Sequence, residues 1–135
     1  MSRIILSEGV GAGLTLGACT VMLAVLGLTP RLSWIPEIPL LGAAILVPVL
    51  VCGLSGFRAG RRRRRLLAGA LAGGVAGAIG GTVGGLSYVL YGKPPANVAV
   101  GLFLGATGGA IAGAAGALLS RRASRARVWP TGERS

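Results

Sequence analysis

The sequence lacks most of the side chains that enzymes use for acid–base and metal chemistry. It contains no histidine, aspartate or glutamine, and its only acidic residues are Glu8, Glu37 and Glu133. General acid–base catalysis and metal coordination depend mainly on imidazole and carboxylate groups, and no nucleophile and base can be paired from the remaining residues. We therefore expect no enzyme activity, no metal site and no cofactor.

Charged residues are also scarce, at 13% of the 135 residues, against about 25% in ordinary globular proteins. Hydrophobic residues make up 53%, 25 residues are glycine and the mean hydropathy is +0.75. The net charge of +11 does not indicate disorder, because disordered chains combine high net charge with low hydrophobicity. This composition is typical of a membrane protein.

Four uncharged apolar stretches divide the chain, at residues 9–28, 38–57, 66–91 and 97–119. Each is long enough to cross about 30 Å of hydrocarbon as a helix, and a spanning segment must satisfy its own backbone hydrogen bonds. The sequence therefore predicts an all-α polytopic protein with four transmembrane helices in residues 1–120. Residues 121–135 form a short basic tail.

The basic residues between these stretches predict the orientation in the membrane. They gather after the second and fourth stretches, at Arg58, Arg61, Arg62, Arg63, Arg64, Arg65, Arg121, Arg122, Arg125 and Arg127. The other two connections contain only Arg31 and Lys93. Because basic residues in short loops resist translocation, we expect a multi-pass protein of the bacterial inner membrane with both termini in the cytoplasm.

The arginine run between two spans also bears on partners. Each arginine near the surface contributes about 1 kcal/mol of attraction to anionic lipid, so we expect anionic head groups, and not nucleic acid, as its partners. Glu8 lies shortly after Arg3 and near the same interface. We expect this carboxylate to form an interfacial ion pair with the arginine cluster, because acids near membrane spans usually pair.

Glycines recur every four residues in three of the stretches. The rows are Gly9, Gly13 and Gly17 in the first, Gly69, Gly73, Gly77, Gly81 and Gly85 in the third, and Gly101, Gly105, Gly109 and Gly113 in the fourth. Residues four apart share one helix face, so each row predicts glycine-zipper packing in which a neighbouring helix approaches closely. The rows serve either packing within one bundle or contact with a second copy.

A shift of 64 residues aligns the two halves of the chain without a gap. It places Gly9, Gly13 and Gly17 on Gly73, Gly77 and Gly81. The alignment predicts a 2+2 internal repeat in which equivalent helices run parallel. In this alignment the second stretch departs from the fourth, with bulky aliphatic residues where the fourth has glycine.

An N-terminal signal is an alternative for the first stretch. Residues 16–19, Leu-Gly-Ala-Cys, resemble the motif at which bacterial lipoprotein signals are cut. Glu8 would interrupt the apolar core of such a signal, and the residues after Cys19 stay apolar. These features favour an uncleaved span, in which Cys19 and Cys52 are small apolar residues.

Two functions fit this architecture. The first is a structural or accessory subunit that packs, through its glycine surfaces, against itself or another membrane protein. The alternative is a homo-oligomeric transporter, channel or holin-like pore for a small solute. In that case Thr15, Thr20, Thr82, Ser87 and Thr107 would offer hydroxyl groups to a polar path.

Overall fold

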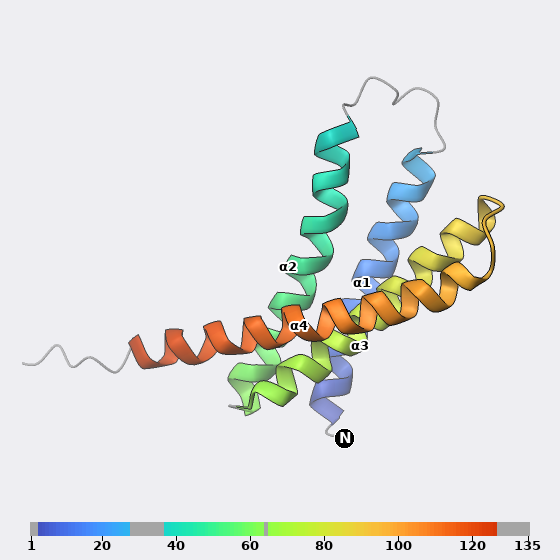
Figure 1. Ribbon diagram of the computed structural model, residues 1–135. Helices are drawn as coiled ribbons and strands as arrows, with labels where there is room; N and C mark the ends of the chain where they lie inside the picture. The colour runs from blue at the N-terminus through green and yellow to red at the C-terminus, as the bar shows by residue number, and fades with distance from the viewer. Residues whose placement is uncertain (1–2, 28–36, 64, 127–135) are drawn as a thin grey trace, which may run out of the picture.

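The computed structural model is all-helical, with four α-helices joined by short connections (Figure 1). The helices are α1 (Arg3–Gly27), α2 (Glu37–Arg63), α3 (Leu66–Leu90) and α4 (Ala96–Ala126). The structure describes residues 3–27, 37–63 and 65–126. Within these helices it does not describe the side chains of residues 4, 23–27, 37–45, 63, 125 and 126. The prediction of a helical fold with four long helices is confirmed.

Among the described residues, three helices are long and apolar enough to cross a membrane. They contain the segments Ile5–Met22, Leu66–Leu90 and Ala96–Ser124, which indicates a membrane protein. The predicted span 38–57 falls within α2, and the side chains of its first eight residues lie outside the described residues.

Two helices continue further than the sequence predicted. The arginine run after residue 57 was expected to be a loop, but α2 extends into it as far as Arg63. Likewise α4 extends to Ala126, so the first residues of the predicted tail are helical. Both extensions are rich in arginine, which has a high helix propensity, so loss of hydrophobicity there does not end the helix.

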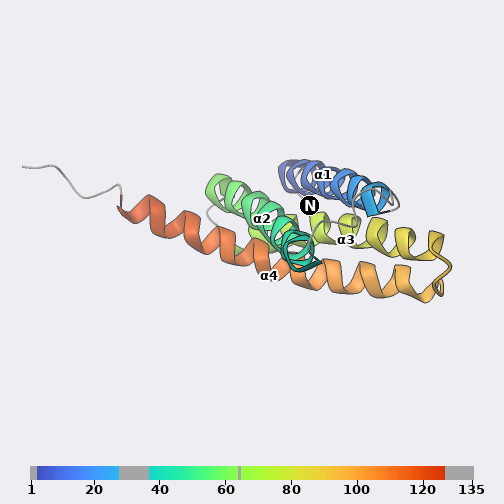
Figure 2. The same cartoon turned by 90° about the horizontal axis from the view of Figure 1, so that it is seen from above.

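The helices form an unequal bundle around the α3–α4 pair. These two helices run antiparallel and share the most extensive interface in the described part of the chain. Helix α1 packs on α3 and α2 packs mainly on α4, whereas α1 and α2 contact each other least. Figure 1 shows α1 and α2 crossing the α3–α4 pair, and Figure 2 shows α1 on the side of α3 away from α4.

A tight turn reverses the chain between α3 and α4. Gly92 has a φ of 77°, a left-handed conformation that glycine adopts without steric cost. Its N–H donates to the carbonyl of Val89 at 2.9 Å, and the N–H of Lys93 donates to that of Tyr88 at 3.2 Å. These bonds form a Schellman motif, which satisfies the last carbonyls of α3 and turns the chain back into α4.

Small residues lie inside the bundle and large apolar residues lie outside. The buried apolar residues are mainly alanines, with Ile5, Leu16 and Cys52. Large side chains such as Leu90, Phe103 and Ile111 are each at least 70% exposed. Exposed apolar area of this extent would promote aggregation in water, whereas in lipid close packing of small residues is the usual means of helix association.

Candidate functional site

The glycine rows of α3 and α4 face each other along the whole interface. Gly69, Gly73, Gly77 and Gly81 lie opposite Gly113, Gly109, Gly105 and Gly101, in that order. A Cβ added to Gly73, Gly77 or Gly81 would overlap the carbonyl oxygen of the glycine opposite. The two backbones are thus in direct contact, in the geometry that allows Cα–H···O contacts between helices.

The row continues to the turn end of the pair. A Cβ on Gly85 would lie 2.6 Å from both the carbonyl oxygen of Asn97 and the Cα of Val98. No residue larger than glycine fits at this position without separating the helices, because a Cβ carbon is not tolerated within 3.0 Å of a non-bonded backbone atom.

The glycine row of α1 makes a different kind of contact. It receives branched side chains of α3: a Cβ on Gly9 or Gly13 would lie 3.0 Å and 2.8 Å from the Cβ atoms of Val75 and Ile79. Gly17 faces Val83, whose Cγ2 would be 3.3 Å away. All three predicted rows are therefore occupied by helices of the same chain.

Helix α2 also contains glycines that contact α4, which the sequence comparison of the two halves missed. A Cβ on Gly56 would overlap the backbone of Gly113, and one on Gly60 would lie 2.6 Å from the Cβ of Ala117. The carbonyl of Gly53 approaches Gly116 in the same way. The spacing of four between Gly56 and Gly60 was the available signal, but Gly60 was assigned to the arginine loop.

Two of the helical glycines face open space. A Cβ on Gly11 of α1 or on Gly108 of α4 would meet no atom within 4 Å, other than those of its own helix backbone and chain neighbours. Both positions line cavities, described below. They provide sites where a side chain can be added without disturbing a helix contact.

The described arginines are concentrated at one end of the bundle. Ile5, Ala59 and Ala68 belong to one buried cluster, so the start of α1, the end of α2 and the start of α3 meet there. The Gly60–Ala117 contact adds the C-terminal part of α4. The exposed arginines of this end are Arg3, Arg58, Arg61, Arg62, Arg65, Arg121 and Arg122.

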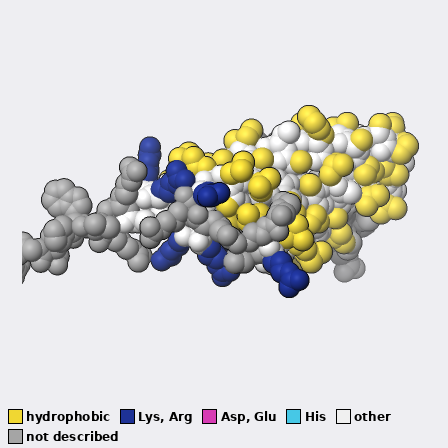
Figure 3. All heavy atoms as spheres, turned by 90° about the horizontal axis from the view of Figure 1, so that it is seen from below, with side chains coloured by type: hydrophobic (Ala, Val, Ile, Leu, Met, Phe, Trp, Pro, Cys, Tyr) yellow, Lys and Arg dark blue, Asp and Glu magenta, His cyan; other side chains and the backbone are white. Residues whose placement is uncertain are grey.

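Figure 3 shows basic side chains towards one end of the molecule and hydrophobic side chains over the other. The remaining members of the predicted arginine set cannot be placed in this way. Arg63 and Arg125 are helical, but their side chains lie outside the described residues. Arg64 and Arg127 lie outside the described residues altogether.

Glu8 forms an ion pair with Arg62, one of the arginines at this end of the bundle. Its Oε1 lies 3.3 Å from the guanidinium of Arg62, and the two side chains are 19% and 60% exposed. The contact joins the first turns of α1 to the last turns of α2. Because one partner is largely exposed, the pair contributes little to stability in water, and its main effect is to neutralise one arginine of the cluster.

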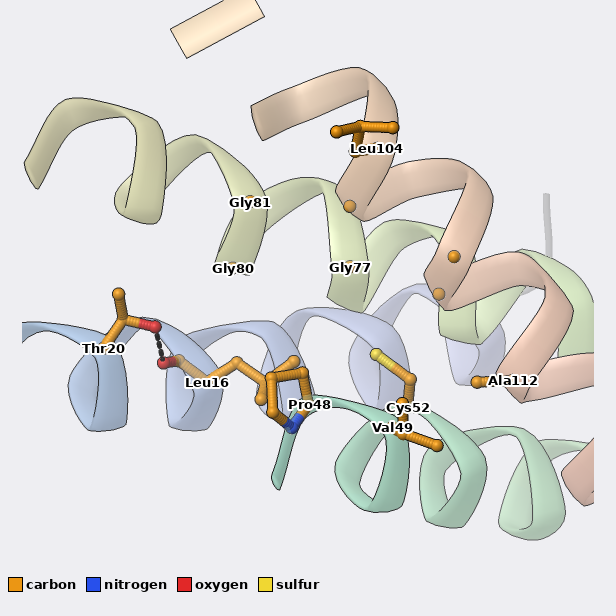
Figure 4. A pocket seen from close by; sticks show the side chains of 13 residues that line it. Leu16, Thr20, Pro48, Val49, Cys52, Gly77, Gly80, Gly81, Leu104 and Ala112 are labelled. Carbon is orange, nitrogen blue, oxygen red and sulfur yellow. Dashed lines mark hydrogen bonds between the residues drawn. The ribbon is translucent and has the colours of Figure 1, made fainter. Parts of the chain in front are cut away.

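A cavity of about 250 Å³ is lined by all four helices, with residues of α1 and α2 on one side and glycines of α3 and α4 on the other (Figure 4). Its walls include Leu16, Pro48, Cys52 and Leu104, and glycine backbone forms much of the remainder. The hydroxyl of Thr20 also lines it but donates to the carbonyl of Leu16 at 2.8 Å. The cavity thus offers an apolar surface without a free polar donor.

A second cavity, here called the seam groove, runs between α1 and α2. Its volume is about 280 Å³, and its lining residues are Glu8, Gly11, Ala12, Thr15, Val51, Leu54, Ser55 and Arg58. No residue of α3 or α4 lines it, so the groove lies on the side of the α1–α2 contact away from those helices. Charged residues stand at one end only.

The hydroxyl groups considered for a polar path do not converge in one chain. Thr15 lines the seam groove and Thr20 the other cavity, whereas Thr82, Ser87 and Thr107 line neither. Each donates to a carbonyl of its own helix at 2.7–3.0 Å. The described residues also contain no cluster of three His, Cys, Asp or Glu side chains that could hold a metal ion.

The two described cysteines are both unpaired. Cys52 is buried on α2 and lines the cavity of Figure 4, whereas Cys19 is partly exposed on α1.

No protein-family model, curated protein or solved structure matches the chain.

Proposed function

We propose that the protein is an integral membrane protein that acts as a structural or accessory subunit, and that glycine-zipper packing holds its four helices together. The observation that supports this proposal is the α3–α4 interface, where facing glycines bring two backbones into contact. An interface of this kind gains its energy from close packing, which is the contribution available in lipid. Large apolar residues are left on the outside, where they contact lipid or another membrane protein.

We further propose that the arginine end lies at the cytoplasmic face of a bacterial inner membrane, with both termini on that side. The clustering of seven exposed arginines at one end supports this orientation, since arginines near helix ends resist translocation. Among the described residues, Lys93 is the only basic residue at the opposite end of the α3–α4 pair. In this orientation α2 also crosses the membrane, so that the chain has four spans.

The structural role is favoured over a homo-oligomeric transporter, channel or holin-like pore. A pore would bring polar groups to a shared path, but the five hydroxyls do not share either described cavity, and each donates within its own helix. The glycine rows, which could have faced a second copy, are already in contact with helices of the same chain. The 64-residue repeat stays a prediction, because equivalent rows in α1 and α3 have different partners.

Reconstitution into liposomes tests the functional class. We expect purified protein to produce no solute-specific flux above that of protein-free liposomes. Photo-crosslinkers in native membranes provide the positive test, placed at exposed Ile111 and, as a matched control, at fully buried Ala76. We expect a defined crosslinked partner band from position 111 alone. Robust flux, or identical crosslinks from both positions, would refute the structural role.

A further inference from the structure

We propose that the seam groove binds one anionic phospholipid, with the phosphate on Arg58 and an acyl chain between α1 and α2. This inference rests on the proposed function in one respect, because it needs α1 and α2 to lie in a bilayer with the arginine end at its surface. It adds a specific lipid site to the general attraction expected of an arginine cluster.

The shape of the groove matches an amphipathic ligand. Glu8 and Arg58 stand at one end, and its length is walled by small or apolar side chains, among them Ala12, Val51 and Leu54. The groove exists partly because Gly11 has no side chain to fill it. A ligand that fits must therefore have a charged head and an apolar body.

The hydroxyl groups that line the groove already donate hydrogen bonds within their own helices. Thr15 donates to the carbonyl of Gly11 at 2.9 Å, and Ser55 donates to that of Cys52 at 2.9 Å. Since both donors are already used, the middle of the groove is suited to hydrocarbon. An acyl chain can lie there without leaving a buried donor unsatisfied.

The charge at the arginine end of the groove favours an anion. Glu8 is paired with Arg62, and among the described residues Arg58 forms no ion pair. Arg61 is also exposed at the same end of α2. A guanidinium binds phosphate oxygens through two parallel N–H donors, so a phosphate head group at Arg58 completes the polar end of the groove.

These features favour a lipid over other occupants. Free phosphate would use the arginine but leave the apolar length of the groove unfilled. A helix of a second copy would fill the length but bring no negative charge from its apolar face. The cavity of Figure 4 has no charged lining residue, so nothing there indicates which molecule fills it.

Native mass spectrometry of the full chain in neutral detergent tests the site, with phosphatidylglycerol and phosphatidylcholine as probes. We expect one phosphatidylglycerol to be retained and phosphatidylcholine to be lost. Gly11→Leu fills the groove, and Arg58→Gln removes the guanidinium that binds the phosphate. Each variant should weaken the retention of phosphatidylglycerol by about tenfold or more.

Two variants serve as matched controls. Gly108→Leu adds the same side chain at the other open glycine, and Arg122→Gln removes an exposed arginine from the same end of the bundle. Both should retain phosphatidylglycerol as the wild type does. Equal loss in Arg122→Gln would show non-specific charge attraction, and full competition by millimolar inorganic phosphate would show a simple anion site.

Membrane insertion is measured in parallel, by carbonate extraction of every variant. If the variants insert normally but retain phosphatidylglycerol as the wild type does, the lipid site is refuted and the proposed function is not affected. If the wild type itself fails to insert, both proposals fail. Should Gly11→Leu misfold, Arg58→Gln still decides the question, because its side chain is exposed.

Discussion

Gly77 lies directly opposite Gly105 in the α3–α4 interface. Alanine raises helix propensity by up to about 1 kcal/mol over glycine, yet its Cβ would overlap the carbonyl of Gly105. We expect Gly77→Ala to lower the free energy of unfolding by about 1–3 kcal/mol, as overpacking does in other cores. Reversible unfolding in mixed detergent micelles, followed by circular dichroism, measures the change.

Gly108→Ala is the matched control, because its Cβ meets open space. With no clash to oppose the gain in propensity, this variant should be neutral or more stable by up to about 1 kcal/mol. Equal stability of the two variants would mean that the facing glycines do not determine how closely α3 and α4 pack.

Glu8 lends itself to a second residue-scale prediction. Its ion pair with Arg62 is partly exposed, and such pairs contribute about 0–1 kcal/mol. We expect Glu8→Gln to lower stability by less than about 1 kcal/mol, and the difference from wild type to disappear at high salt, where screening weakens the pair. The same detergent unfolding measurement at two salt concentrations checks this. A larger loss that persists in salt would assign Glu8 a buried structural role.

At the scale of elements, the α1 row predicts a gradient of tolerance. A Cβ added to Gly13 would lie 2.8 Å from the Cβ of Ile79, whereas one added to Gly17 would lie 3.3 Å from the outer Cγ2 of Val83. A Cβ atom cannot move without its helix, but a terminal methyl can adjust. We therefore expect Gly13→Ala to cost at least about 1 kcal/mol more than Gly17→Ala, measured by the same unfolding experiment. Equal costs would indicate that α1 shifts as a rigid unit.

The sequence predicted the existence of the four helices because each apolar stretch is bounded by charge or proline. It did not predict where α2 and α4 end, since arginine continues a helix as readily as leucine does. The twelve predicted glycines were identifiable because their spacing alone places them on one face. The partner of each row was not, because spacing contains no information on which helix lies opposite.

The seam groove illustrates the same limit. Its residues come from two helices that are nearly 40 positions apart in the sequence at Ala12 and Val51. Only the relative register of α1 and α2, which depends on how both pack on α3 and α4, brings Gly11, Leu54 and Arg58 to the same groove. No pattern within either helix alone indicates a groove.

For the whole molecule, the distribution of side-chain size and the distribution of charge are separate features. Small residues at the helix contacts determine how the bundle packs, and they are distributed along all of its length. The arginines lie at one end and take little part in the described contacts. A change in the arginines should therefore alter orientation without altering the fold.

Replacement of Arg61 to Arg65 by serine tests that separation. Orientation depends on the difference in basic residues between the two sides, and these five residues supply most of the excess at the α2–α3 connection. We expect reporter fusions at the C-terminus to show mixed or inverted topology, while unfolding stability in detergent falls by no more than about 1 kcal/mol. Serine at Arg122, Arg125 and Arg127 should have a smaller effect on topology, because the α2–α3 arginines still hold their end in the cytoplasm. An unchanged reporter pattern in the five-serine variant would refute the orientation argument, and a large loss of stability would show that the arginines are part of the packing.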